Sequence, residues 1–317
     1  MHYLIQGFAT IEKGGERVMS IESLARQGDI TAAGGRQYSE WHRAWHRLKR
    51  GKPAMFGLGV LIFLILASAL APWLAPHDPY EQNLVMRFKP IGTKGHPLGT
   101  DSFGRDMLSR LLYGSRISLV VGLSSVTLGL VFGVTLGLIA GYYRRLDNLI
   151  MRVIDVMLAF PGVLLAIAVV AALGPGMWNV VIAIGIWSIP TFARIVRGQV
   201  LAIKDSEYIT ATKAMGCRDG RILVKHILPN CLAPVIVYAT MRIASSIMSA
   251  ATLSFLGLGA QPPIPEWGAM IAEGRSFLYN APHIATVPGL AIMLVVFAFN
   301  LLGDGLRDAL DPNLKDV

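Results

Sequence analysis

Long apolar stretches without charged residues alternate with shorter polar segments along most of the chain. A helix needs about 20 mostly apolar residues to cross the hydrocarbon core of a bilayer. One charge-free run, 156–193, is too long for a single helix, and we divide it at the turn-forming sequence 173–176. The pattern therefore predicts an all-α, polytopic membrane protein with six transmembrane helices, at residues 54–75, 117–143, 149–172, 179–196, 232–256 and 284–302.

The composition agrees with a chain that lies largely in a membrane. Only 15% of the 317 residues are charged and 53% are hydrophobic, whereas a soluble domain is about 25% charged. The first apolar run begins after residue 52 and is longer than the usual core of a signal peptide. We therefore expect a retained helix at 54–75.

The net charge is +9, and the distribution of Lys and Arg residues indicates an orientation. If residues 1–53 lie inside, the inner segments hold 21 of the 29 Lys and Arg residues and the outer segments hold 7. Because cytoplasmic loops are enriched in Lys and Arg, we expect both termini in the cytoplasm. Topology thus accounts for the positive charge, and we expect no nucleic-acid partner.

Residues 1–53 form the expected cytoplasmic N-terminal segment. Within 38–52, Trp41, Trp45 and Leu48 recur at helical spacing beside several arginines. This pattern is typical of an amphipathic helix on a lipid surface, so membrane lipid is an expected partner.

The sequence lacks the motifs of nucleotide hydrolysis and of common hydrolases. No GxxxxGK[ST] loop, HExxH or GxSxG motif is present. His42 and His46 are four residues apart, but no third metal ligand accompanies them. Asp304, Asp308 and Asp311 follow the last span among glycines and a proline, where helix capping and termination are common roles. We expect no catalytic residue and no metal site, so uphill transport would draw its energy from a partner or an ion gradient.

Small residues recur at every fourth position of the second span. Such a stripe leaves a groove along one helix face, in which another helix can approach closely. The spacing therefore predicts tight helix packing at Ser125, Gly129, Gly133, Gly137 and Gly141.

Arg242 lies ten residues into the fifth span, near the middle of the bilayer. An arginine at that depth costs about 2.5–3.5 kcal/mol on insertion scales, so its side chain should face protein or water. Two interpretations are open. Arg242 either forms an internal ion pair with Asp155, or it lines a solute path, which would suit a solute that carries a carboxylate.

The segment 197–230, between the fourth and fifth spans, is predicted to form a helix, a turn and a second helix. Gly216 can adopt positive φ and close the first helix. Asp219 can cap the second helix, and Pro229 marks the end of the segment before the fifth span. One face of the segment carries Arg218, Arg221 and Lys225. This basic loop could contact lipid headgroups. A connection between two spans does not need a rigid helical elbow, however, so the elbow could instead bind a partner.

The segment also resembles the coupling loop of ABC importer permeases, whose pattern joins Glu-Ala-Ala, Gly and Ile-x-Leu-Pro at fixed spacing. Gly216 and Leu228-Pro229 match that pattern in place. Thr210-Ala211-Thr212 replaces Glu-Ala-Ala, and His226-Ile227 shifts the isoleucine by one position.

Further stretches resemble the dipeptide/oligopeptide subfamily of these permeases, at 98–119, 254–268 and 299–312. The likeness extends over 54–312 and is closest to the second ("C") permease subunit of dipeptide and glutathione importers. It implies the ABC importer type I permease fold, an external segment at 76–116, a core domain at 117–303 with five spans, and a cytoplasmic tail at 304–317. Within the external segment, we expect the turn 104–106 to pack on a partner permease rather than to contact an external binding protein.

The resemblance implies a set of partners in a bacterial cytoplasmic (inner) membrane. They are a sister permease that forms a heterodimer with this chain, two ABC ATPase subunits that bind ATP and Mg, and an extracytoplasmic solute-binding protein. The chain itself would be no enzyme and would hold no cofactor. The residues implied at the ATPase contact are Tyr208, Thr210, Ala211, Thr212, Ala214, Met215, Gly216, Arg218, Arg221, His226, Leu228 and Pro229.

The resemblance favours di- or oligopeptides, glutathione included, as the imported solute. A nickel complex or another small solute is an alternative within the same family. An uncoupled channel is a third alternative, against which the elbow with Gly216 and Leu228-Pro229 argues.

Overall fold

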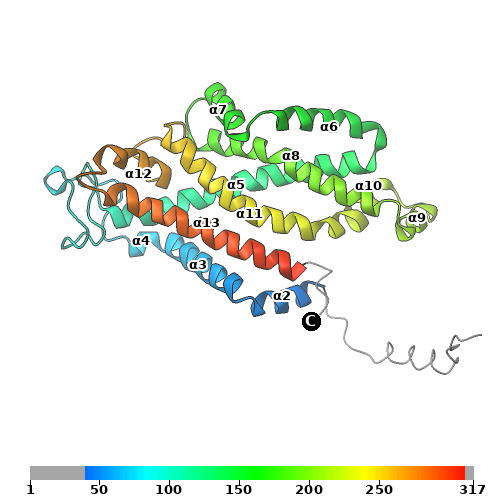
Figure 1. Cartoon of the computed structure of the whole chain (residues 1–317), viewed down its shortest axis with the longest axis horizontal. Helices are drawn as coiled ribbons and strands as arrows, with labels where there is room; N and C mark the ends of the chain where they lie inside the picture. Colours follow the sequence, from blue (N-terminus) through cyan, green and yellow to red (C-terminus); the bar gives the residue numbers. More distant parts are fainter. Residues whose placement is uncertain (1–39, 311–317) are drawn as a thin grey trace, which may run out of the picture. The chain divides into compact units, whose positions relative to one another are not determined.

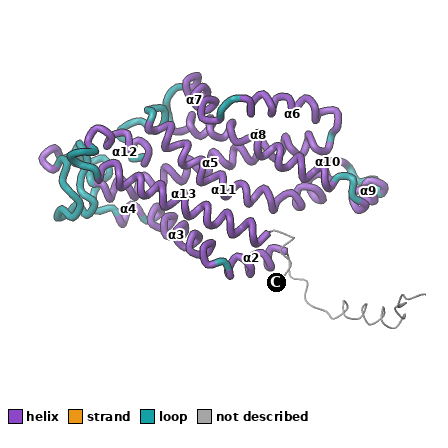
Figure 2. Tube along the Cα trace, viewed as in Figure 1, coloured by secondary structure: helices purple, strands orange, loops and turns teal. Residues whose placement is uncertain are grey.

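The computed structural model describes residues 40–310. These residues form helices joined by loops, and no β-strand occurs among them (Figures 1 and 2). The expectation of an all-α protein is confirmed for this part of the chain. The chain divides into two compact units, 1–43 and 44–317, and every candidate span lies in the second. Residues 1–39 and Asp311 lie outside the described residues.

Five helices of residues 40–310 are long and apolar enough to cross a membrane. A bent pair, α6 (Arg144–Ala159) and α7 (Gly162–Leu173), raises the number to six if it is counted as one span. The expectation of a polytopic membrane protein is therefore confirmed. The five helices are α3 (Lys52–Ala69), α5 (Met107–Tyr142), α8 (Met177–Ile203), α11 (Leu228–Phe255, continuous with the turns from Asp219) and α13 (His283–Leu310).

The third predicted span, 149–172, is wrong as a single straight helix. α6 and α7 meet at 94°. Phe160 adopts an extended conformation, because the ring of Pro161 disfavours helical backbone in the residue before it. Gly162 follows, and a side chain at this position would overlap the indole of Trp187 in α8. The break therefore lets the backbone of this span lie directly against α8.

The predicted end of the sixth span is also wrong. α13 runs on to Leu310, so Asp304 and Asp308 lie inside the helix and do not terminate it. A side chain at Gly305 would overlap Ala54 of α3. Close packing between α13 and α3 thus accounts for this glycine better than helix termination does.

The small-residue stripe of α5 faces α8. A Cβ atom placed on Gly133 would lie 2.5 Å from the Cβ atom of Phe192, which is closer than real Cβ atoms approach. Ser125 is fully buried, and its hydroxyl donates a 2.7 Å hydrogen bond to the carbonyl oxygen of Val121 in the same helix. Equivalent Cβ atoms would lie 2.5 or 2.6 Å from atoms of α8 at Gly129, Gly137 and Gly141.

The remaining helices surround this pair. α11 packs against α5, α8, α12 (Trp267–Gly274) and α13, and α13 packs in turn against α3 (Figure 1). The short helices α2 (Glu40–Arg50) and α4 (Ala71–Leu74) flank α3 in the chain. Large apolar side chains stay exposed on the spans, among them Phe63, Phe132 and Phe297. Such a surface suits lipid or a partner helix rather than water.

Candidate coupling surface and membrane-embedded arginine

The predicted coupling segment forms an elbow that projects beyond the long helices (Figure 1). α9 (Glu207–Ala214) ends at a turn in which Gly216 has a φ of 78°, a conformation that glycine adopts without a Cβ clash. α10 (Asp219–Ile222) follows, and a π turn at Leu223–Ile227 leads directly into α11. We call residues 204–229 the elbow.

Two details of the predicted elbow are wrong. The side chain of Asp219 does not cap α10 and instead accepts a 2.7 Å hydrogen bond from the Tyr142 hydroxyl at the end of α5. Pro229 does not end the segment, because the helix continues from Asp219 to Phe255. The π turn directly before Pro229 changes the hydrogen-bond register, so the missing N–H of the proline does not break the helix.

Three isoleucines anchor the elbow to the long helices. Ile209, Ile222 and Ile227 are fully buried in one cluster with Phe192 and Val200 of α8. Burial of an isoleucine side chain contributes about 1.5–3 kcal/mol. A displacement of the elbow would therefore carry the adjoining ends of α8 and α11 with it.

Polar contacts join the elbow to the C-terminal end of α5 as well. Lys204 Nζ donates a 3.0 Å hydrogen bond to the carbonyl oxygen of Gly141, and Lys213 Nζ lies 5.2 Å from the centroid of the Tyr142 ring. Together with the bond between Tyr142 and Asp219, these contacts tie the elbow to a third long helix. The sequence gives little signal for them, because the partners are far apart in the chain.

Most of the residues implied at a partner contact lie on the surface of the elbow. Met215, at the turn, is 76% exposed although its side chain is large and apolar. Thr212 is buried instead, and its hydroxyl donates a 2.7 Å hydrogen bond to the carbonyl oxygen of Tyr208, so it supports α9 from within. His226 and Leu228 are half-buried. The exposed members are Tyr208, Thr210, Ala211, Ala214, Met215, Gly216, Arg218, Arg221 and Pro229.

Two ion pairs join α6 to α8. Arg197 donates to both carboxylate oxygens of Asp147, at 2.6 and 2.7 Å. Arg194 donates to Asp155 at 2.6 Å. The ion pair between Arg242 and Asp155, one of the two interpretations of the sequence, is therefore wrong, because Asp155 is paired with Arg194.

Arg242 is buried between α11 and α8 without a carboxylate partner among the described residues. Its Nε donates to the Ser188 hydroxyl at 3.0 Å, and its Nη1 donates to the Ser245 hydroxyl at 3.1 Å. The guanidinium lies over the ring of Trp187, 4.3 Å from the ring centroid. Its Nη2 is buried and has no hydrogen-bond partner in residues 40–310. A cation that lacks a counter-charge at this depth is typical of a functional position.

Hydroxyl side chains follow one side of α11 beyond Arg242. Ser245 and Thr252 are exposed and Ser249 is half-buried, and the three recur at a spacing that places them on one helix face. The face adjoins a groove of about 510 Å³ between α11 and α13, whose lining includes Met248, Met293 and Asn300. Polar groups on the exposed face of a span suit a neighbour that is protein or water rather than lipid.

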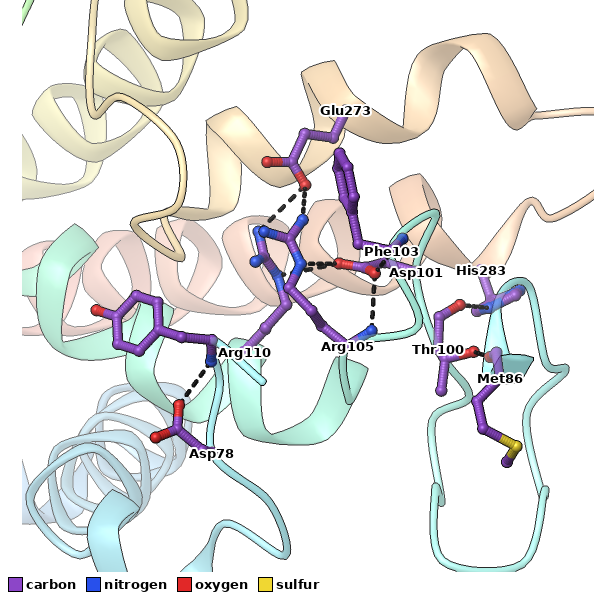
Figure 3. Close-up of polar contacts among 10 residues, drawn as sticks. Asp78, Met86, Thr100, Asp101, Phe103, Arg105, Arg110, Glu273 and His283 are labelled. Atoms are coloured by element: carbon purple, nitrogen blue, oxygen red, sulfur yellow. Dashed lines mark hydrogen bonds and ion pairs between the residues drawn. The ribbon is translucent and has the colours of Figure 1, made fainter. Parts of the chain in front are cut away.

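The end of the long helices opposite the elbow, beside α4 and α12 in Figure 1, holds a buried polar cluster, which Figure 3 shows close up. Arg105 and Arg110, 2% and 0% exposed, both donate to Glu273 Oε2, at 2.7 and 3.1 Å. Arg105 Nε also donates to Asp101 Oδ2 at 2.6 Å. Arg105 and Asp106 are buried within this chain, so the turn 104–106 packs against the chain's own helices, and its packing on a partner permease stays a prediction. The cluster fastens the loop before α5 to α12.

Comparison with known families gives two matches that together cover most of the chain. Residues 133–316 match the model of the binding-protein-dependent transport system inner membrane component. Residues 39–90 match the N-terminal TM domain of oligopeptide transport permease C.

Individual relatives are similar along almost their whole length. The chain is 51% identical over 278 residues to the dipeptide transport system permease protein DppC of Alkalihalophilus pseudofirmus, which covers 87% of this chain and 91% of that protein. It is 53% identical over 277 residues to the glutathione transport system permease protein GsiD of Pectobacterium atrosepticum, with 87% and 92% covered.

A solved structure shares the fold. An inward-facing form of the MetNI methionine ABC transporter superposes with a TM-score of 0.54 at 20% sequence identity, over 65% of this chain and 98% of that chain. The family match, the relatives and the shared fold agree with the expected ABC importer type I permease fold. The chain is therefore a member of the binding-protein-dependent transport system inner membrane components, the membrane-embedded permeases of ABC transporters.

Proposed function

We propose that this chain is a permease subunit of a binding-protein-dependent importer that carries di- or oligopeptides, glutathione included, across a bacterial cytoplasmic membrane. The observation that carries the proposal is the identity of about half the residues, along 87% of the chain, with permeases named for dipeptide and glutathione transport. The absence of a phosphate-binding loop from the sequence supports an assignment of ATP hydrolysis, with its Mg²⁺, to two partner ATPase subunits.

The elbow is the proposed contact with an ATPase subunit. An exposed methionine at a turn, on a base of buried isoleucines, suits insertion into an apolar groove of a partner. The basic side chains of Arg218 and Arg221 would complement an acidic rim of that groove. ATP binding would draw the two ATPases together and displace the elbow. The buried isoleucines and the contacts to Tyr142 would transmit this displacement to α5, α8 and α11. The solute path would then close on one side of the membrane and open on the other.

The groove between α11 and α13 is the proposed contact with a sister permease, and the hydroxyl face of α11 would line the path between the two permeases. Arg242 lies at one end of that face. Its Nη2 would donate to the carboxylate of a passing peptide, because that nitrogen makes no hydrogen bond within the described residues. Both termini would lie in the cytoplasm, as the excess of Lys and Arg in the inner segments indicates.

The proposal predicts the composition and the response of a purified complex. Affinity purification of this chain from its native membrane should recover a second permease and P-loop ATPases. Addition of the extracytoplasmic binding protein with a dipeptide or with glutathione should raise the ATP hydrolysis rate of that complex, whereas a nickel complex should not. A chain recovered without ATPases would contradict the importer, and stimulation by the nickel complex alone would contradict the peptide assignment.

A further inference from the structure

Three potential metal ligands meet where the outer loop reaches the first turn of α5. His77 follows α4, His96 lies in the next loop, and Asp106 is the residue before α5. One ligand atom from each residue lies within 4.8 Å of the others. The Asp106 side chain is fully buried, and the His96 side chain is 13% exposed. The cluster thus joins three separate pieces of the chain at a shielded point.

Ser109 orients two of the three residues. Its backbone N–H and its hydroxyl donate to Asp106 Oδ2 at 2.7 and 2.8 Å. The same hydroxyl accepts a 3.1 Å hydrogen bond from the backbone N–H of His77. Asp106 Oδ1 is left for His96 Nδ1, at 2.9 Å. Partners of this kind hold metal ligands in place at known metal centres.

His77 supplies an independent sign that the cluster takes a ligand. Its Nδ1 is buried and has no hydrogen-bond partner in the described part of the chain. Buried polar atoms are almost always satisfied, so this nitrogen calls for a partner. The rings of His77 and His96 are stacked, with centroids 4.5 Å apart and planes at 22°. The torsion about the Cβ–Cγ bond of a histidine is soft, so the His77 ring can adjust to a bound ion.

We propose that His77, His96 and Asp106 form a structural centre for a borderline divalent transition-metal ion, with Zn²⁺ as the ion that fits best. Two imidazole nitrogens and one carboxylate oxygen are a common zinc donor set, and a water molecule would complete four-coordination. Such nitrogen donors do not suit Mg²⁺ or Ca²⁺. The ion would replace the hydrogen bond between His96 and Asp106 and would fasten the outer loop to the start of α5. This centre is independent of the solute that the permease carries.

The test uses the full chain, purified in detergent without a polyhistidine tag, stripped with a chelator and titrated with Zn²⁺ against a chromophoric competitor. The informative variants are Asp106→Asn, which keeps an oxygen to cap α5, and His77→Phe, which keeps a ring stacked on His96. His283→Gln is the matched control, because this histidine lies on the same side but bonds to the Thr100 carbonyl oxygen outside the cluster.

Wild type and His283→Gln should bind one Zn²⁺ per chain with equal affinity, and each cluster variant should bind it at least about tenfold more weakly. Zn²⁺ should raise the thermal midpoint of wild type and not that of the cluster variants, and saturating Mg²⁺ should not compete. X-ray absorption should report nitrogen and oxygen neighbours at about 2.0–2.2 Å. Equal Zn²⁺ binding by all four proteins, or binding by none, would overturn the proposal.

Discussion

The Trp187 indole lies over the guanidinium of Arg242, with 4.3 Å between the ring centroid and the Arg242 Cζ atom. The same indole also lies against Gly162, at the break between α6 and α7. Trp187 thus connects the bend of one span to a cation in another, which has no carboxylate partner within residues 40–310. A cation over an aromatic ring is stabilised by about 2 kcal/mol or more where water is excluded, which helps to hold Arg242 in place without a counter-ion.

Arg242→Gln should weaken the transport of peptides that have a free C-terminal carboxylate. A hydrogen bond to a charged group is worth about 1.5–3 kcal/mol, so the KM should rise roughly tenfold to a hundredfold. The KM of the C-terminally amidated peptide should change little. This comparison distinguishes a loss of carboxylate recognition from a general loss of protein stability. Kinetics of uptake into proteoliposomes measure both values. Arg307→Gln, which removes an exposed arginine of α13, is the control. An equal loss for both peptides would argue against recognition by Arg242.

Gly216→Asp should leave the chain inserted and assembled but abolish hydrolysis that depends on solute. Nothing lies within 4 Å of a Cβ atom at this turn, so the new side chain meets no neighbour, although the positive φ of residue 216 strains the backbone of any residue other than glycine. The change places a carboxylate beside the exposed Met215. Gly220→Asp is the matched control, because Gly220 is also exposed and open but lies in α10 with ordinary backbone angles. The ATPase rate in the presence of loaded binding protein distinguishes the two. Normal stimulation in Gly216→Asp would count against the elbow as the coupling contact.

Gly133→Val should separate α5 from α8 and destabilise the protein. The added Cβ atom would lie 2.5 Å from Phe192 Cβ, and overpacking of this kind costs about 1–3 kcal/mol. Gly59→Val is the control, because a Cβ atom on Gly59 meets nothing within 4 Å. Thermal unfolding in detergent should show a lower midpoint for Gly133→Val alone. Equal midpoints would mean that the helices can separate without cost.

Glu273→Gln should destabilise the cluster before α5. Arg105 and Arg110 would keep their charges at 2% and 0% exposure with one carboxylate fewer, and loss of a partner from a buried pair costs about 3–5 kcal/mol. The midpoint of thermal unfolding should fall clearly. Glu81→Gln, an exposed glutamate of the same outer segment, should leave it unchanged. A midpoint as high as that of wild type would show that Asp101 alone compensates both arginines.

Glu266 makes the stability depend on pH. This glutamate caps α12 by accepting a 2.9 Å hydrogen bond from the Ala269 N–H, and burial raises the pKa of its carboxyl above the ordinary value. The folded state therefore holds this proton more tightly than the unfolded state, and the free energy of unfolding should fall as pH rises above the ordinary glutamate pKa of about 4.3. Glu266→Gln, which keeps a capping oxygen, should gain stability relative to wild type as pH rises through that window. Parallel stability curves from pH 4 to pH 8 would contradict this origin.

Much of the fold follows from local pattern. Charge-free runs locate the spans, and the glycines at Gly129 and Gly133 mark a close helix contact, because both signals are set by residues near each other in the chain. The identity of the contacting helix, α8, does not follow, since a stripe of small residues carries no information about its partner. The bend at Pro161 was not predicted, because the charge-free run 156–193 continues across it.

Among the candidate sites, too, only those set by residues close together in the chain could be predicted. The elbow could be predicted, because Gly216 and the surrounding helical signals lie within one short segment. The partner of Asp155 could not, since Arg194 and Arg242 are both arginines and only the packing of α6 on α8 selects between them. The proximity of His77 to His96 and Asp106 could not be predicted from the sequence either, because an irregular loop brings the three residues together.

Uptake into proteoliposomes tests the central claim most directly. The vesicles would hold this chain, its sister permease and the two ATPases, with ATP at the ATPase side and binding protein with labelled dipeptide or glutathione at the other. The account predicts accumulation of one of these solutes above its external concentration, with ATP and not with a non-hydrolysable analogue. Equilibration of the solute without ATP would contradict the account and would indicate an uncoupled channel.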